Sequence, residues 1–156
     1  MKKALLVALF PTLLLLSCGS GTPAAQFQSE GACALLTFEE ASKIMGATTQ
    51  PTRPGPDTAT KKGCVWGTAT ANFLQMDVRE SSSPAEADAA YEDALSSSDQ
   101  LEDVSGLGDK ACWAGKSSRL FVLKGKYWVT ISAFPREKEP FDAAYAAAEL
   151  AIPRLP

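Results

Sequence analysis

The sequence contains no histidine, and this absence excludes several kinds of active site. Its 156 residues include 15 lysines and arginines, 18 aspartates and glutamates, and no imidazole. A Ser-His-Asp triad, a Cys-His dyad and a His-ligated zinc site all need an imidazole to move a proton or to bind metal near neutral pH. These classes are excluded, and we predict no metal site, no cofactor and no enzymatic activity.

The sequence also lacks an excess of positive charge. Its formal net charge is -3 and its pI is about 5.0. Proteins that bind nucleic acid need many lysines and arginines to displace counterions from the phosphates. We therefore expect no nucleic-acid partner. The hydrophobic fraction of 46% is that of an ordinary globular chain, and the length favours one domain.

The first seventeen residues have the pattern of an export signal. Lys2 and Lys3 precede an apolar stretch from residue 4 to residue 16, which is too short for a membrane-spanning helix. The stretch ends in Leu-Leu-Ser-Cys at residues 15–18, which resembles the lipobox of bacterial lipoproteins. The resemblance implies that Cys18 carries fatty acyl chains such as palmitate and anchors the protein to a membrane. The alternative is a secretory signal with an incidental cysteine.

Three segments follow from this pattern. Residues 1–17 are the predicted signal peptide, 18–32 a flexible tether rich in Gly, Ser, Pro, Ala and Gln, and 33–156 a single exported domain. We expect the protein in the cell envelope, either at the outer membrane or on the outer face of the cytoplasmic membrane.

Helix-start signals and alternating residues predict an α+β fold. Thr37 to Glu40 and Ser83 to Glu86 have the spacing of capping boxes, and a third helix is expected near Pro140. Polar and apolar residues alternate from 73 to 80, as in a half-buried antiparallel strand. Further strands are expected at 64–68, 110–114, 119–124 and 126–134, and an extended Pro-rich loop at 47–62. We predict an antiparallel sheet of about five strands with two or three helices packed on one face.

The two halves of the domain resemble each other. Each runs from a cysteine with a nearby tryptophan through strands to an alanine-rich helix, and both helices contain Asp-Ala-Ala-Tyr, at 88–91 and at 142–145. Two interpretations stay open: an internal duplication, and two similar alanine-rich amphipathic helices.

Three cysteines remain besides Cys18, which allows one disulfide bond and leaves one thiol. Export favours oxidation, and the residues alone leave three pairings open. A Cys-x-Leu-Leu-Thr motif at 33–37, Cys-x-Trp at 64–66, and residues 104–111 resemble a domain of unknown function common in actinobacterial cell-envelope lipoproteins. The resemblance implies a bond between Cys33 and Cys64 and adds no activity. A bond between Cys64 and Cys112 is the main competing pairing.

Cys112 is the one candidate nucleophile. Lys110 and Lys116 are close in sequence and would lower the pKa of a nearby thiol. The alternative, which we favour, is a buried strand residue, because the chain offers no histidine base and no Cys-x-x-Cys motif.

Three further patterns have a functional and a structural interpretation. Gly106 and Gly108 lack the third glycine of a dinucleotide-binding motif and indicate a tight turn. Nine acids and no basic residue lie between 80 and 109, whereas 110–138 holds seven basic residues and one acid; a solvated helix face is favoured over a site for calcium or a cationic partner. The strand aromatics are expected in the core, with a ligand groove as the alternative: Trp66, Trp113, Trp128 and Tyr127.

Together these features predict a lipid-anchored, non-enzymatic binding or interaction module of the envelope. Its partners are the membrane, through Cys18, and an envelope protein or small ligand. The alternatives are a small-ligand or lipid carrier, with an apolar cavity under the Pro-rich loop, and a thiol-dependent enzyme.

Overall fold

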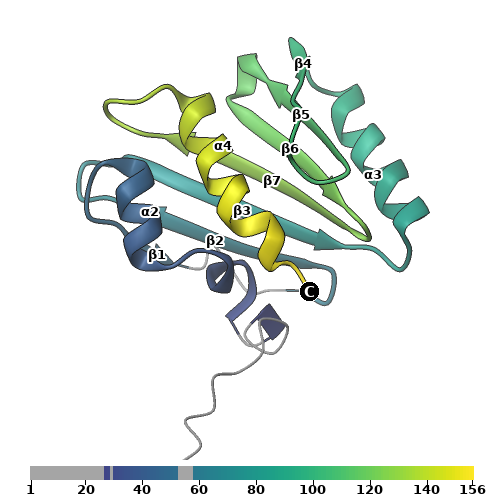
Figure 1. The fold of residues 1–156 in the computed structure, drawn as a ribbon, viewed down its shortest axis with the longest axis horizontal. Coiled ribbons are helices and arrows are strands. Elements are labelled where there is room, and N and C mark those ends of the chain that lie inside the picture. The colour runs from purple at the N-terminus through teal and green to yellow at the C-terminus, as the bar shows by residue number, and fades with distance from the viewer. Residues whose placement is uncertain (1–26, 29, 53–57) are drawn as a thin grey trace, which may run out of the picture.

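The computed structural model describes residues 27, 28, 30–52 and 58–156, and its elements follow the predicted order closely (Figure 1). The helices are α2 (Phe38–Met45), α3 (Pro84–Ser96) and α4 (Pro140–Ala151), with 3-10 turns η1 (Gly31–Leu35), η2 (Gly115–Ser117) and η3 (Ile152–Arg154). The strands are β1 (Gln50–Thr52), β2 (Lys61–Gly67), β3 (Phe73–Glu80), β4 (Leu101–Asp103), β5 (Lys110–Ala114), β6 (Arg119–Lys124) and β7 (Tyr127–Phe134). The fold is α+β, as predicted.

The strands of the described residues form one antiparallel sheet in the order β1-β2-β3-β7-β6-β5-β4. The sequence predicted about five strands and missed the two outer ones. Both have three residues, which is too short for an alternation to be recognised. β1 lies in the predicted Pro-rich loop, and its Pro51 is tolerated because an edge strand needs fewer backbone donors.

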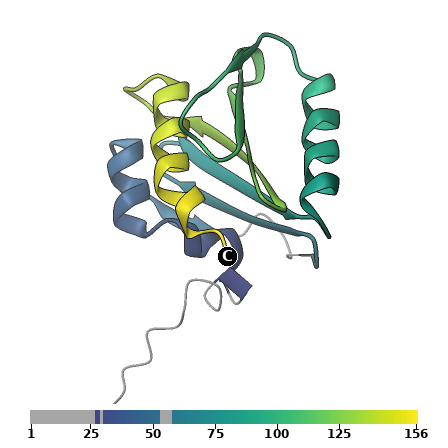
Figure 2. The same ribbon diagram turned by 45° about the vertical axis from the view of Figure 1, so that its right-hand side comes forward.

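Helices cover both faces of the sheet, which corrects the prediction that they pack on one face (Figure 2). Because successive strand side chains point to opposite faces, β7 shows the arrangement directly. Val129 packs in the cluster with η1, α2 and α4, on what we call the α4 face. Its neighbour Trp128 packs with Ala87 and Tyr91 of α3, on the α3 face.

The core on the α4 face is built from a helix of small residues. Five alanines of α4 are buried, and they pack among Leu74, Met76, Val129 and Ile131 of the two central strands. A methyl group fills little space, so the helix can lie close to the sheet and still leave no void. The buried alanines are Ala143, Ala144, Ala147, Ala148 and Ala151.

The folded part of the chain starts before the predicted boundary at Cys33. Phe27 is only 1% exposed, its ring meets Tyr127 edge-on at 6.2 Å, and the Lys62 ammonium lies 5.5 Å from its centre. A single aromatic residue in a polar, small-residue run gives no periodic signal. Phe27, within the segment predicted as tether, therefore packs as part of the folded domain.

Both of the predicted N-terminal caps, at Thr37 and Ser83, are present, with one difference. Thr37 and Glu40 form the complete capping box of α2. At α3, the Ser83 hydroxyl accepts from the Glu86 N–H, but the Glu86 carboxylate accepts from the N–H of Ser82 at 2.9 Å, not from Ser83. The helix is capped, with the return bond displaced by one residue.

The two Asp-Ala-Ala-Tyr helices lie on opposite faces of the sheet. Tyr91 of α3 packs on the α3 face and Tyr145 of α4 borders the core of the α4 face. A duplication related by rotation about the sheet normal would place both helices on one face. The architecture therefore gives the duplication no support.

Candidate functional site

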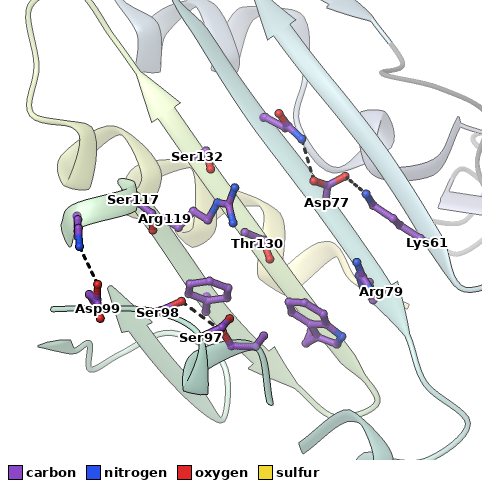
Figure 3. A pocket seen from close by; sticks show the side chains of 15 residues that line it. Lys61, Asp77, Arg79, Ser97, Ser98, Asp99, Ser117, Arg119, Thr130 and Ser132 are labelled. Carbon is purple, nitrogen blue, oxygen red and sulfur yellow. Dashed lines mark hydrogen bonds and ion pairs between the residues drawn. The ribbon is translucent and has the colours of Figure 1, made fainter. Parts of the chain in front are cut away.

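A groove lies on the α3 face, beside the C-terminal end of α3 and over the part of this face that α3 leaves uncovered (Figure 3). It has a volume of about 560 Å³. α3 shields the apolar half of this face, whereas the half over β3 and β2 is polar. The groove is lined by Lys61, Gln75, Asp77, Arg79, Ala94, Ser97, Ser98, Asp99, Lys116, Ser117, Arg119, Phe121, Trp128, Thr130 and Ser132.

The strand register explains why these side chains meet. Residues paired across neighbouring strands point to the same face. The register forms three rows that cross the sheet from β6 or β7 toward β2. The rows are Arg119-Ser132-Gln75, Phe121-Thr130-Asp77 and Trp128-Arg79-Lys61.

The β3 side of the groove holds a fixed carboxylate. Gln75 Nε2 donates to Asp77 Oδ2 at 2.8 Å, and Lys61 Nζ lies 3.4 Å from Asp77 Oδ1. Oδ1 is buried and has no hydrogen bond, so the lysine charge is its main compensation. Gln75 and Lys61 thus hold the Asp77 carboxylate in position.

The opposite end of the groove is formed where α3 ends and η2 begins. Lys116 Nζ and Asp99 Oδ2 form an exposed ion pair of 2.8 Å across this end. The hydroxyls of Ser97 and Ser98 both donate to the Ala94 carbonyl, at 3.1 and 3.3 Å. Their oxygens remain able to accept, so this end offers acceptor and donor atoms together.

Two arginines complete the groove. The Arg79 guanidinium lies 5.0 Å from the centre of the Trp128 ring, in a cation–π contact between paired residues of β3 and β7. Arg119, the first residue of β6, extends beside Thr130 and Ser132 (Figure 3). In the described residues neither guanidinium has a carboxylate partner within ion-pair distance.

Cys33 and Cys64 form a disulfide bond with their Cα atoms 5.0 Å apart, the pair implied by the resemblance. It joins η1 to β2 under the α4 face, remote from the groove. Cys112 is free and buried, 4% exposed, in the cluster beneath α3. Burial, and then the Asp103 charge, raises the pKa of its thiol, opposite to the lowering expected from nearby lysines.

The four strand aromatics do not gather in one groove. Trp66 and Tyr127 are buried on the α4 face, whereas Trp128 packs under α3 and lines the groove. Trp113 contacts Phe141 of α4 and borders a smaller hollow of about 460 Å³ near β4. The core interpretation therefore holds for all four, and Trp128 has both roles.

The segment with Gly106 and Gly108 is a turn held against the next hairpin. Asp109 N–H donates to the Leu123 carbonyl at 2.7 Å, and the Asp109 carboxylate accepts from Gly125 N–H at 2.7 Å and from Lys124 Nζ at 3.0 Å. Both glycines have positive φ, +86° and +57°. The tight-turn interpretation accounts for both of them.

The charge segregation along the chain becomes pairing in space. Lys110 Nζ bridges Asp88 at 2.7 Å and Glu92 at 2.8 Å, which ties β5 to α3. These hydrogen bonds raise the pKa of Lys110. Acidic residues of the segment 80–109 thus form ion pairs with a basic residue of the segment 110–138. These exposed pairs agree with the interpretation as a solvated helix face. The part of the chain that the structure describes holds no cluster of three or more acids or cysteines able to bind a metal ion.

Sequence reasoning missed most of the groove. The alternation on β3 indicates that Gln75, Asp77 and Arg79 share a face, but it does not indicate that this face borders a groove. Arg119 and Ser132 reach it only through the pairing of β6 with β7. Cys18, the other predicted site residue, lies outside the described residues, so its acylation remains a prediction.

Neither a protein-family model nor a curated protein matches the chain. The resemblance to the actinobacterial lipoprotein domain therefore remains a prediction. None of the helices in the described ranges is long and apolar enough to cross a bilayer.

Proposed function

We propose that this chain is an exported protein, held to a membrane by lipid on Cys18, that binds a ligand in the groove without converting it. The observation that carries the binding proposal is the uncovered polar half of the α3 face. On the apolar half of this face, the side chains of β5 and β6 pack beneath α3 and are shielded from water. Here the chain instead leaves about 560 Å³ bordered by charged and hydroxyl side chains.

Two further features favour binding over catalysis. The carboxylates of the groove, Asp77 and Asp99, are each ion-paired with a lysine. A general base must be free to take a proton from a substrate. The thiol of Cys112 is buried beneath α3 with a raised pKa, which opposes a nucleophilic role.

The envelope location rests on the signal pattern and agrees with the disulfide bond. Bonds such as Cys33–Cys64 persist mainly in oxidising compartments. The Cys18→Ser variant tests the anchor: the mature protein should move from the membrane fraction to the soluble fraction. Continued tight membrane retention would contradict lipidation at Cys18.

The carrier alternative needs an apolar cavity under the Pro-rich loop. Residues 53–57 of this loop lie outside the described residues. The hollow between Phe27 and the described end of the loop, at Ala59 and Thr60, has no space that a water molecule could occupy. It is smaller than the groove, and we therefore place the ligand in the groove.

The groove is tested by a photo-crosslinking amino acid, benzoylphenylalanine, at Ser97, whose side chain lines the groove at the end of α3. Ala89, exposed on the same helix and outside the groove, is the matched control position. After irradiation of intact cells, mass spectrometry of the purified protein should show a discrete adduct at residue 97 that residue 89 lacks. Equal adducts at both positions, or none at 97, would contradict the groove as the binding site.

A further inference from the structure

The charges of the groove do not balance. Four basic side chains and two acidic ones line it, and the two acids are paired with Lys61 and Lys116. The remaining cations, Arg79 and Arg119, have no carboxylate partner in the described structure. This local excess of positive charge stands in a chain whose formal net charge is -3.

Arg79 is exposed, and its guanidinium stacks on Trp128 in the free protein. Its guanidinium lies 5.0 Å from the Trp128 ring centre, and the two residues are register partners on adjacent strands. Stacking uses the flat face of the guanidinium and leaves the N–H groups at its edge free to donate. A fixed side chain loses less conformational freedom on binding, so its hydrogen bonds favour the complex more strongly.

Arg119 approaches the groove from β6. It is the register partner of Ser132, and Thr130 lies on the same face of the neighbouring strand. The guanidinium fork donates two parallel hydrogen bonds to a carboxylate or phosphate, and nearby hydroxyls can add a third. Ser132 and Thr130 are both half-buried, where such bonds are less exposed to water than at a flat surface.

The two arginines lie on opposite sides of the groove. They stand on β3 and β6 with β7 between them, and their register positions differ by four residues along the strands. Sheet geometry then puts their Cα atoms about 16 Å apart. Both arginines are exposed and line the groove, and the groove between them suits a small molecule with acidic groups at both ends.

We infer that the groove takes a small anion carrying carboxylate or phosphate groups, one bound by Arg119 beside Ser132 and Thr130 and a second by Arg79 over Trp128. This inference rests on the proposed binding function. A carboxylate is a planar oxyanion and a phosphate a tetrahedral one, and the guanidinium of an arginine binds either of them through two parallel hydrogen bonds. The positive groove in an acidic protein also steers such a ligand to this face.

The test is a titration of the ¹⁵N-labelled mature Cys18→Ser protein with small-molecule probes, in which NMR measures the chemical shifts of the backbone amides. Citrate and pyrophosphate are the probes with several acidic groups, acetate is the probe with one, and glucose and choline are the neutral and cationic probes. Vesicles of phosphatidylglycerol or phosphatidylcholine show whether a lipid headgroup supplies the anion. We expect citrate or pyrophosphate to shift the amides of Arg119, Thr130 and Ser132, and to bind more tightly than acetate.

Three variants make the result specific. Arg119→Gln should weaken the binding of citrate or pyrophosphate about tenfold or more, and Arg119→Lys should give an intermediate loss because it keeps the charge but not the fork. Arg136→Gln removes the same charge from an exposed position outside the groove and should change affinity less than about twofold. Thermal unfolding of each variant checks that the fold is intact.

The outcomes separate the two proposals. Equal weakening by Arg119→Gln and Arg136→Gln would reduce the effect to general electrostatics and overturn the inference. No shift with any anionic probe up to about 10 mM would also overturn it. If glucose or choline shifts the groove amides and the anionic probes do not, the groove binds a ligand of another kind. The same holds if residue 97 is crosslinked in cells but no anionic probe binds. In both cases the proposed function stands and the anion inference is wrong. If the crosslink at residue 97 also fails, both are wrong.

Discussion

Arg154, at the C-terminal end of the chain, forms a two-point ion pair with Glu40 near the start of α2. Its Nη1 and Nη2 atoms donate to the two Glu40 oxygens at 2.7 and 2.5 Å, and Nη1 also donates to the Leu35 carbonyl at 2.9 Å. Glu40 at the same time closes the capping box with the Thr37 N–H. One carboxylate therefore joins a helix start to a segment more than a hundred residues away.

This pair should make stability depend on pH. Hydrogen bonds from Arg154, helped by Thr37, lower the pKa of Glu40 from 4.5 to about 2. A carboxyl group with a lowered folded-state pKa stabilises the fold fully above its unfolded pKa, and this contribution is lost as the pH falls toward about 2. Glu40→Gln keeps the capping geometry but loses the charge, and should cost about 1–2 kcal/mol at neutral pH.

Urea unfolding of both proteins at neutral pH and near pH 2.5 checks this prediction. The difference between wild type and Glu40→Gln should shrink as the carboxyl protonates. Glu39→Gln, at an exposed neighbouring position, should stay within about 0.5 kcal/mol of wild type. A difference that does not change with pH would contradict the role assigned to the pair.

The disulfide bond should supply a large share of the stability. Cys33 and Cys64 are separated by 31 residues, and closing a loop of this size in the unfolded chain corresponds to about 3.5–4 kcal/mol. The free energy of unfolding of the Cys33→Ala/Cys64→Ala double variant, measured with urea, should be lower by this amount. Dithiothreitol should destabilise only the wild type. Insensitivity of the wild type to the reductant would show that the bond does not form.

The sequence could predict most strands but not the side on which α3 packs, although one signal pointed to it. β3 alternates between Leu74, Met76 and Val78 and polar residues, as a strand with one covered face does. In β6 the run Leu120 to Leu123 is buried throughout, which indicates cover on both faces. These patterns agree with cover on both faces of β6 and an open face over β3.

The groove could not be predicted because its arginines meet only through long-range pairing. Arg79 and Arg119 are brought to one face by the strand order β3-β7-β6, which places the last strand between two earlier ones. Local alternation gives the face of a side chain within its own strand and says nothing of strand order. By contrast the bounds of β5 and β6 follow from local patterns and agree with the prediction.

Cys112 should be unreactive in the folded protein. It is 4% exposed beneath α3, and burial raises the pKa of its thiol, which lowers the thiolate fraction. In the mature Cys18→Ser protein, Ellman's reagent at pH 8 should react with about one thiol in urea and far more slowly under native conditions. Cys112→Ala sets the background, because Cys33 and Cys64 are bonded to each other. Fast native labelling would return the thiol-dependent enzyme to consideration.

Gly108 should tolerate a side chain less well than another glycine with similar backbone geometry. Gly108 and Gly46 have φ of +57° and +67°, so an alanine is strained at both positions. At Gly46 a Cβ atom meets nothing within 4 Å. At Gly108 it would collide with the Leu123 carbonyl and lie 2.8 Å from Val122 Cγ1.

The comparison of Gly108→Ala with Gly46→Ala therefore separates crowding from backbone strain. Gly46→Ala should cost about 1 kcal/mol, and Gly108→Ala should cost at least about 1 kcal/mol more, because the turn must move away from β6. Urea unfolding measures both losses. Equal losses would mean that the segment around Gly108 shifts freely, and that the Asp109 contacts with Lys124 and Gly125 do not hold the turn in place.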